Sequence, residues 1–126
     1  MHVYVPIVRG PDQKAVWSFA KAFAYALSAE RPTTATAEYR LSHRPKDRVP
    51  IDYNQNAWGR TLASVYSVRP RPEASVSTPV TWAEVERGLE TSDFRMDNVP
   101  ARVRQRGDLW RALLSPRGRG RLPGSP

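Results

Sequence analysis

One long helical pattern, set among short extended segments, constrains the fold of this chain more than any other feature. Between Asp12, which is suited to cap a helix, and Pro32, which stops one, apolar residues recur at helical spacing. They make up one face of the predicted helix: Val16, Phe19, Ala20, Phe23, Ala26 and Leu27. The pattern therefore predicts a packing helix whose apolar face is covered by other elements.

Four segments rich in β-branched and aromatic residues are predicted as strands. They are residues 2–7 before the helix, and residues 35–41, 48–53 and 62–69 after it. Thr81 and Glu84 have the spacing of a capping box and predict a short helix to about Leu89, and a last helical stretch is predicted within residues 101–114. The predicted order of elements is therefore β, α, β, β, β, followed by two helical stretches.

Positive charge is concentrated toward the C-terminus. The 126 residues hold 20 Lys and Arg against 12 Asp and Glu, a net charge of +8, and residues 101–126 alone contain seven arginines and one acid. Residues 115–126 are rich in Gly, Pro and Arg and have few large apolar side chains, so we expect them to be disordered. This tail is either a non-specific phosphate-binding arm or compositional drift without a function.

Several classes of protein are excluded by composition. The length has room for one domain. The absence of cysteine excludes cysteine-ligated zinc, iron–sulfur clusters and thiol nucleophiles. No stretch approaches the ~18 apolar residues that span a bilayer, and the N-terminus lacks a signal-peptide pattern, so we expect a cytoplasmic protein without a membrane partner.

Residues 51–56 (Ile-Asp-Tyr-Asn-Gln-Asn) place an acid at the end of an apolar strand, followed by three amide side chains after the tyrosine. A carboxylate at a strand end suits a divalent metal, and amides suit the edge of a base or sugar. The alternative is an Asn-rich turn beside a solvated acid.

A pair of arginines forms a second candidate site. Arg69 and Arg71 fall on one side of an extended segment because side chains alternate along a strand, and two guanidinium groups can grip a phosphate. A solvated basic strand face is the alternative. His2 is a candidate phosphate donor, against the alternative of a core or edge histidine.

Aromatic residues interleave with arginines through the middle of the chain, as in stacking platforms along a basic groove. The aromatic residues are Tyr39, Tyr53, Trp58 and Tyr66, and the arginines are Arg40, Arg44, Arg60 and Arg69. Core and edge aromatics of a small sheet give the same pattern, so both interpretations stay open.

Taken together, these segments resemble the polymerase domain of the bacterial ATP-dependent DNA ligase D, a member of the archaeo-eukaryotic primase superfamily. Five segments match that family in order and spacing: the motif II histidine strand at 2–7, motif III at 51–61, the arginine strand at 66–72, the turn after it at 76–82, and the C-terminal end at 94–110. The resemblance covers residues 1–114 and implies the C-terminal portion of a primase-type, RRM-like core, which is an α/β fold with a small mixed or antiparallel sheet and helices packed on one side.

The resemblance also implies roles for individual residues. Asp52 corresponds to a catalytic carboxylate that binds metal, and Gln55 to a contact on the nucleotide side. His2 and Arg69 correspond to contacts with the incoming triphosphate. Two further arginines are candidate DNA contacts: Arg60 and Arg71.

The family extends or fills DNA ends during non-homologous end joining, uses two divalent metals, Mn or Mg, and commonly prefers ribonucleotides. The implied partners are therefore DNA ends and nucleoside triphosphates, with Ku and ligase modules by family analogy. The expected location is the bacterial cytoplasm, at the nucleoid when DNA is bound.

One family motif has no counterpart. Motif I is a pair of aspartates one residue apart, and no two aspartates here have that spacing; Glu84 and Glu86 do, but on a helix they point in different directions. One carboxylate cannot hold two metals. We therefore expect the C-terminal half of a repair polymerase domain that is inactive alone, with a separate chain as the candidate source of the other half. The alternatives are a non-catalytic DNA-binding module and the product of a decayed gene.

Overall fold

The computed structural model describes residues 1–123. The chain divides into two compact units that interleave along the sequence. Unit 1 comprises residues 1–6 and 63–118, and unit 2 comprises residues 7–62 together with the segment from Arg119 onward. Among residues 1–123, no helix has the length and apolar character needed to cross a membrane.

Unit 2 is built on helix α1 (Gln13–Glu30), which confirms the predicted long helix. Its N-terminus is capped as expected, because the Asp12 carboxylate accepts a hydrogen bond of 2.7 Å from the Ala15 N–H. At the other end the Arg31 N–H donates to the Leu27 carbonyl at 2.9 Å, and Pro32 follows. The cap and the proline thus fix both ends of the helix.

The sheet of unit 2 is small and parallel. It joins β1 (Ala35–Thr36) to β2 (Val49–Pro50), with η1 (Leu41–His43) between them. Both strands are shorter than predicted. The Arg44 guanidinium donates to the carbonyls of Glu38 and Tyr39 at 3.1 and 3.2 Å, so the chain after β1 bonds to its own loop and its pairing with β2 stops.

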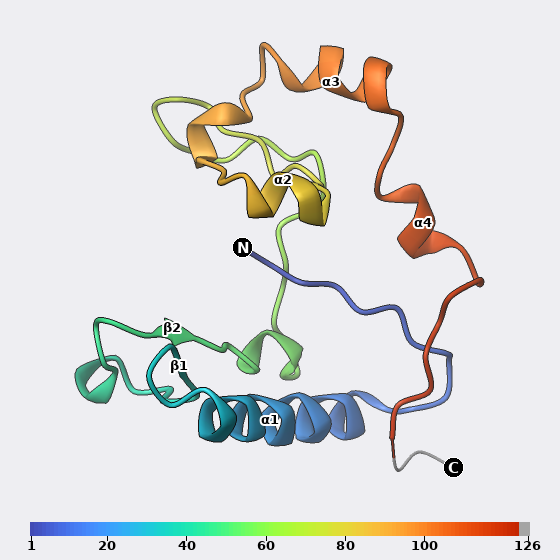
Figure 1. Cartoon of the computed structure of the whole chain (residues 1–126). Coiled ribbons are helices and arrows are strands. Elements are labelled where there is room, and N and C mark those ends of the chain that lie inside the picture. The colour runs from blue at the N-terminus through green and yellow to red at the C-terminus, as the bar shows by residue number, and fades with distance from the viewer. Residues whose placement is uncertain (124–126) are drawn as a thin grey trace. The chain divides into compact units, whose positions relative to one another are not determined.

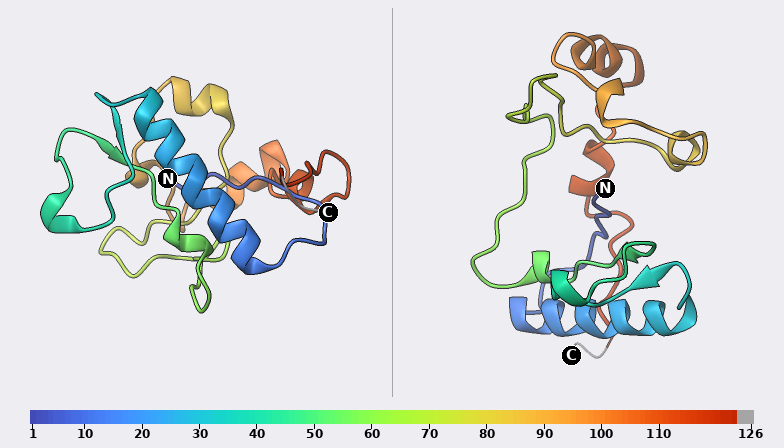
Figure 2. Two further views of the ribbon diagram at one scale, coloured as in Figure 1. Left: turned by 90° about the horizontal axis from the view of Figure 1, so that it is seen from below. Right: turned by 90° about the vertical axis from the view of Figure 1, so that its left-hand side faces the viewer.

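The core of unit 2 lies between α1, the sheet and η2 (Asn54–Asn56). Figures 1 and 2 show β1, β2 and η2 on the same side of α1. Ala24, which is fully buried, packs there with Ala37 and Tyr53. The small side chain of Ala24 allows this close approach.

The packed face of α1 differs from the predicted one. Trp17, Ala20 and Ala24 face the core, whereas Phe19 and Phe23 stack on each other at 6.5 Å between ring centroids and remain exposed. Trp17 lies outside the predicted apolar set, yet its ring packs edge-on against Tyr53 at 6.0 Å. Two aromatic rings of the predicted core face therefore lie on the surface.

Unit 1 is dominated by short helices and turns. Its helices are α2 (Trp82–Glu86), η3 (Thr91–Asp93), α3 (Val99–Arg106) and α4 (Arg111–Leu114). The capping box predicted at Thr81 is present, with both reciprocal hydrogen bonds to Glu84. The last predicted helical stretch is divided in two, because Gly107 takes a left-handed φ of +74° and ends α3.

The predicted strands at 2–7 and 62–69 do not form as strands. Their pairing is reduced to isolated bridges, parallel at Ile7–Gly120 and antiparallel at Val68–Val76. Residues 62–69 cannot stay extended because Tyr66 has a φ of +62°. Parallel and antiparallel pairing therefore both occur, as the mixed α/β prediction requires, although little regular sheet is present.

Part of the predicted disordered tail makes specific contacts. The Val8 N–H donates to the Gly120 carbonyl at 2.9 Å, and Leu122 is buried with 7% exposure. Backbone pairing and burial of this leucine are interactions that composition does not reveal. Residues 124–126 of the predicted tail lie outside the described residues.

Candidate functional site

The two arginines of the predicted phosphate-binding segment lie on a tight turn. The Arg69 N–H donates to the Ser75 carbonyl at 2.7 Å, and the Arg71 N–H donates to the Arg69 carbonyl at 2.8 Å. The second bond closes a three-residue turn around Pro70, whose fixed φ suits this geometry. The segment is therefore a turn and not the extended strand that the spacing predicts.

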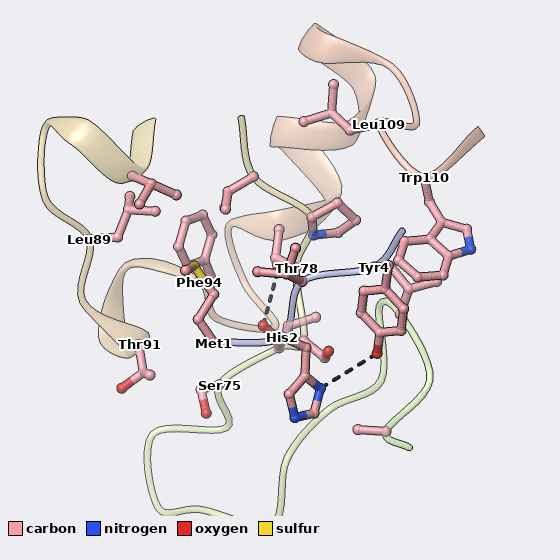
Figure 3. A pocket seen from close by; sticks show the side chains of 18 of the residues that line it. Met1, His2, Tyr4, Ser75, Thr78, Leu89, Thr91, Phe94, Leu109 and Trp110 are labelled. Carbon is pink, nitrogen blue, oxygen red and sulfur yellow. Dashed lines mark hydrogen bonds between the residues drawn. The ribbon is translucent and has the colours of Figure 1, made fainter. Parts of the chain in front are cut away.

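Arg69 and Arg71 nevertheless line one hollow in unit 1 together with His2. The hollow has a volume of about 920 Å³. In the view of Figure 3, Met1 and His2 lie between Leu89 and Phe94 on one side and Tyr4 and Trp110 on the other. The structure thus brings together the two residues assigned to a triphosphate and one of the two assigned to DNA.

The polar residues that line this hollow lie beside aromatic side chains. The His2 Nδ1 and Tyr4 Oη atoms lie 3.5 Å apart, and the Tyr4 ring packs edge-on against Trp110 at 4.7 Å between centroids (Figure 3). Hydroxyl groups from the segment after the arginine turn also line it: Ser75, Ser77 and Thr78. Guanidinium, imidazole and hydroxyl groups around one hollow are the donors that phosphate oxygens accept from.

A buried ion pair holds the elements behind this hollow. The Arg102 guanidinium donates to both oxygens of Glu84, at 2.6 and 2.8 Å, and to the Pro79 carbonyl at 3.2 Å. Hydrogen bonds from Arg102 outweigh the effect of burial and lower the pKa of Glu84 to about 2. Glu84 is thereby engaged, while Glu86 is exposed, so these two acids do not form a carboxylate pair.

A second polar contact joins the C-terminal motif of unit 1 to the start of the arginine segment. The Tyr66 hydroxyl donates to Asp108 Oδ1 at 2.7 Å, and the Trp110 N–H donates to the same oxygen at 2.9 Å. Burial and the bond to Asp108 raise the pKa of Tyr66 to about 12. Tyr66 itself has a left-handed φ of +62°, and its N–H donates to the Ser77 carbonyl at 2.7 Å.

Asp52 and Gln55 lie in unit 2, in the turn that includes η2. Asp52 Oδ1 accepts from the Asn54 N–H at 3.0 Å, and Asp52 Oδ2 accepts from Gln55 Nε2 at 3.1 Å. Asn54 Oδ1 accepts from Trp17 Nε1 at 3.1 Å, which ties the turn to α1. The structure therefore brings the two predicted residues into contact on a turn anchored by α1.

The carboxylate of Asp52 does not by itself form a metal centre. Both of its oxygens accept protein donors, and no group of three or more His, Asp or Glu residues is placed to hold a metal within residues 1–123. A two-metal centre requires several carboxylates. The described residues do not fit the two-metal site that the resemblance implies.

The structure separates the four aromatic residues of the interleaved pattern. Tyr53 is buried in the core of unit 2, and Tyr66 is partly buried in unit 1, whereas Tyr39 and Trp58 are exposed. Arg60 is exposed two residues after Trp58, in unit 2. The core interpretation therefore holds for Tyr53, and the stacking interpretation stays open for Trp58.

Sequence reasoning missed several residues that shape the hollow. Tyr4 and Trp110 form part of its lining, and Arg102 holds Glu84 from 18 positions along the chain. The capping box in the sequence predicted the start of α2, but it gave no indication that Glu84 pairs with Arg102 on α3. The Gly107 to Trp110 segment was the available signal for the Asp108 contact, because it belongs to the matched C-terminal motif.

Comparison with known proteins agrees with the resemblance seen in the sequence. The family model described as LigD, primase-polymerase domain, matches residues 1–110. A multifunctional non-homologous end joining DNA repair protein LigD from Mycobacterium tuberculosis is 29% identical over 113 residues, and one from Mycolicibacterium smegmatis is 31% identical over the same length. Each match covers 90% of this chain and 15% of the relative, so the chain spans a small part of these proteins.

A solved structure gives the same result at the level of the fold. The polymerase domain of Mycobacterium tuberculosis ligase D in complex with DNA matches with a TM-score of 0.76 and 30% sequence identity. The match covers 84% of this chain and 37% of that one. The sequence match and the structural match coincide, and the chain belongs to the LigD primase-polymerase domain family.

Proposed function

We propose that this chain supplies the triphosphate-binding part of a DNA end-joining repair polymerase. The observation that carries the proposal is the common hollow of His2, Arg69 and Arg71. Arg69 and His2 donate to the phosphate oxygens of a nucleoside triphosphate, and the neighbouring Arg71 adds positive charge to the same hollow. Gln55, on the Asp52 turn, contacts the nucleotide, and Arg60 and Arg71 contact DNA.

The surroundings of the hollow support an anionic ligand. Glu84, on α2, accepts hydrogen bonds from Arg102 at 2.6 and 2.8 Å, so its charge is matched and does not offset the two lining arginines. Glu90 is the acid that lines the hollow itself. Two lining arginines against one glutamate leave a positive excess, which favours phosphate over a cationic or neutral ligand.

Catalysis of nucleotidyl transfer requires groups beyond these. Asp52 is the candidate metal-binding carboxylate, for Mn or Mg, but a single carboxylate whose oxygens already accept two donors does not assemble a two-metal centre. We therefore expect no nucleotide incorporation by the chain alone. The partner that completes such a centre is a polypeptide equivalent to the remaining part of the polymerase domain, with Ku and ligase modules as further partners.

Exposed apolar side chains support a polypeptide partner. Val5 is 74% exposed in unit 1, and Phe23 is 55% exposed on α1 of unit 2. Exposed apolar groups of this kind are typical of surfaces that another chain covers. Co-expression with the N-terminal part of a related polymerase domain should raise the soluble yield. An unchanged yield would count against such a partner.

The triphosphate site is tested by titrating ATP into the full chain in EDTA, which removes metal from the measurement. Arg69→Gln should weaken binding by about 10- to 100-fold, because a charge-assisted hydrogen bond is worth about 1.5 to 3 kcal/mol. Arg104→Gln, on an exposed part of α3 outside the hollow, is the matched control and should bind as the parent does. Equal weakening in both variants would show that ATP binding depends only on the net charge of the chain, and it would overturn the proposed site.

A non-catalytic DNA-binding module is the second candidate function, favoured by the lack of a metal-binding cluster within residues 1–123. Primer extension with Mn tests the inactivity that both candidates share, and the ATP titration separates them, because a module that binds only DNA should not bind ATP at the hollow. If the chain binds DNA in a salt-sensitive way and does not extend the primer, the result agrees with both candidates, because each is inactive alone. Extension that disappears in Asp52→Ala would show a complete polymerase and overturn the expected inactivity.

A further inference from the structure

A second, smaller pocket lies in unit 2 and shares no lining residue with the hollow of unit 1. Its volume is about 340 Å³, and it is lined by Gln13, Lys14, Trp17, Ala57 and Trp58. Pockets for small ligands span roughly 300 to 1,000 Å³. This one is therefore of a size for a single planar group and too small for an extended chain.

Trp58 is the unusual member of this pocket. Its side chain is 88% exposed, the highest value among the exposed large apolar residues of the described chain. An indole left in water at the mouth of a pocket offers a flat π-face that a ligand can cover. The second indole, Trp17, is half-buried and has its Nε1 donor satisfied by Asn54, so its ring presents only an apolar surface to the pocket.

The loop that carries Trp58 is fixed to helix α1. Gln13 Nε2 donates to the Ala57 carbonyl at 3.0 Å and to the Asn56 carbonyl at 3.4 Å. Together with the bond from Trp17 to Asn54, these contacts anchor the residues just before Trp58. The backbone that presents the exposed ring is therefore positioned before any ligand arrives, which lowers the entropic cost of binding.

Cationic residues line this pocket, contact the Trp17 ring and follow Trp58 closely in the chain. Lys14 lines the pocket, Arg60 follows Trp58 by two residues, and Lys21 Nζ lies 5.1 Å from the centroid of the Trp17 ring. The acid at this end of α1, Asp12, is engaged in capping the helix through Ala15. Aromatic rings among cations complement a ligand that combines a planar apolar group with negative charge.

We propose that Trp58 and Lys14 form a base-stacking subsite for single-stranded nucleic acid. An unpaired base stacks on the Trp58 indole at the pocket, and the adjoining phosphate lies against Lys14. A base within a duplex has both faces covered by its neighbours, so the subsite favours single strands over duplexes. The proposal rests on unit 2 alone and does not depend on the triphosphate hollow, and the loss of ATP binding in Arg69→Gln, which leaves Trp58 and Lys14 in place, reports on the latter separately.

The test is fluorescence anisotropy of a labelled oligothymidylate of about 12 nucleotides, titrated with the full chain at several salt concentrations. Trp58→Ala should weaken binding by about 5- to 100-fold, because stacking of a base on an aromatic ring is worth about 1 to 3 kcal/mol. Trp58→Phe should recover part of this loss. Phe23→Ala removes an exposed ring of the same unit outside the pocket and should bind as the parent does.

The salt dependence distinguishes stacking from charge. Trp58→Ala should leave the slope of log K against log salt unchanged, whereas Lys14→Ala should reduce its magnitude by about 0.7 for a single strand. Equal affinity of parent and Trp58→Ala would overturn the proposal. So would tighter binding to an equal-length duplex, or a Trp58-dependent self-association in sedimentation without any effect on oligonucleotide binding, since the occupant would then be a second copy of the chain.

Discussion

Around Glu84 in unit 1 the contacts are charged, whereas around Tyr53 in unit 2 they are aromatic and apolar. Glu84 is 5% exposed and accepts two hydrogen bonds from Arg102, which also lies over the Phe94 ring at 5.4 Å. Tyr53 is 9% exposed and packs against Trp17 and Ala24 of α1. Unit 1 therefore depends on an ion pair between short helices, and unit 2 on one long helix.

This difference matters for the two candidate sites. Phosphate binding in the hollow of unit 1 depends on the charges of Arg69 and Arg71. Glu84 is already paired with Arg102, so it does not neutralise them. The turn of Asp52 and the pocket of Trp58 need a rigid backbone, which α1 supplies through Trp17 and Gln13. Variants that loosen one unit should consequently leave the site of the other intact.

The largest expected effect is from Glu84→Gln. Removing one partner of a buried ion pair leaves Arg102 without its countercharge and should lower the free energy of unfolding of unit 1 by about 3 kcal/mol. Hydrogen exchange should speed up at the amides of α2 and α3 but not at those of α1. Glu86→Gln, exposed on the same helix, is the control and should change stability by less than about 0.5 kcal/mol.

The pH dependence of the free energy of unfolding should report on the same ion pair of Glu84 and Arg102. The pKa of Glu84 is lowered to about 2 in the folded chain, so the folded state favours the ionised form. Its stabilisation is present above the pKa of an ordinary glutamate and is lost as the pH falls toward 2, by about 2 to 3 kcal/mol. Urea unfolding from pH 6 to 2 should reveal this loss. A Glu84→Gln variant with the same acid slope as the parent would contradict it.

Ala24→Leu should loosen unit 2 in a comparable way. Ala24 is fully buried against Ala37 and Tyr53, so a larger side chain forces α1 away and should cost about 2 kcal/mol. The amides of α1 should then exchange faster while those of α2 and α3 are unaffected. Ala22→Leu places the same side chain on an exposed part of α1 and should have little effect. Equal effects of both leucines would argue against the packed face.

Tyr66→Phe should give the smallest change, about 1 kcal/mol, through loss of the hydrogen bond to Asp108. The pKa of Tyr66 is raised to about 12, so its protonated form stabilises unit 1 below pH 10 and this contribution is lost as the pH rises through 12. Burial also raises the pKa of Tyr53, so phenolate absorbance should show more than one late-titrating tyrosine, and Tyr66→Phe should remove one of them. Tyr39→Phe, on an exposed tyrosine, should leave that late step in place.

Local sequence signals predicted the helices well. Asp12 and Pro32 marked the ends of α1, and Thr81 with Glu84 marked the start of α2, because caps and breakers act within a few residues. The strands were overestimated, since the length of a strand depends on a partner far along the chain. Arg44 removes such partners by binding two carbonyls of its own loop.

The candidate sites were predictable in their residue types but not in their surroundings. Periodicity paired Arg69 with Arg71, and both do line one hollow, although through a turn at Pro70. Nothing in the sequence linked Glu84 to Arg102, because the contact spans two helices. The exposed face of α1 was also missed, since apolar spacing identifies candidate core positions without saying which of them find a neighbour.

Hydrogen–deuterium exchange of the full chain with saturating ATP in EDTA tests the triphosphate assignment most directly. We expect slower exchange in residues 66–78, around Arg69 and Arg71, and no change in α1 that depends on Arg69. Arg69→Gln should abolish the protection at the same ATP concentration, and Arg104→Gln should retain it. Protection confined to α1 and the Asp52 turn, or no protection at a concentration where ATP binds, would contradict the assignment of the triphosphate to the hollow of unit 1.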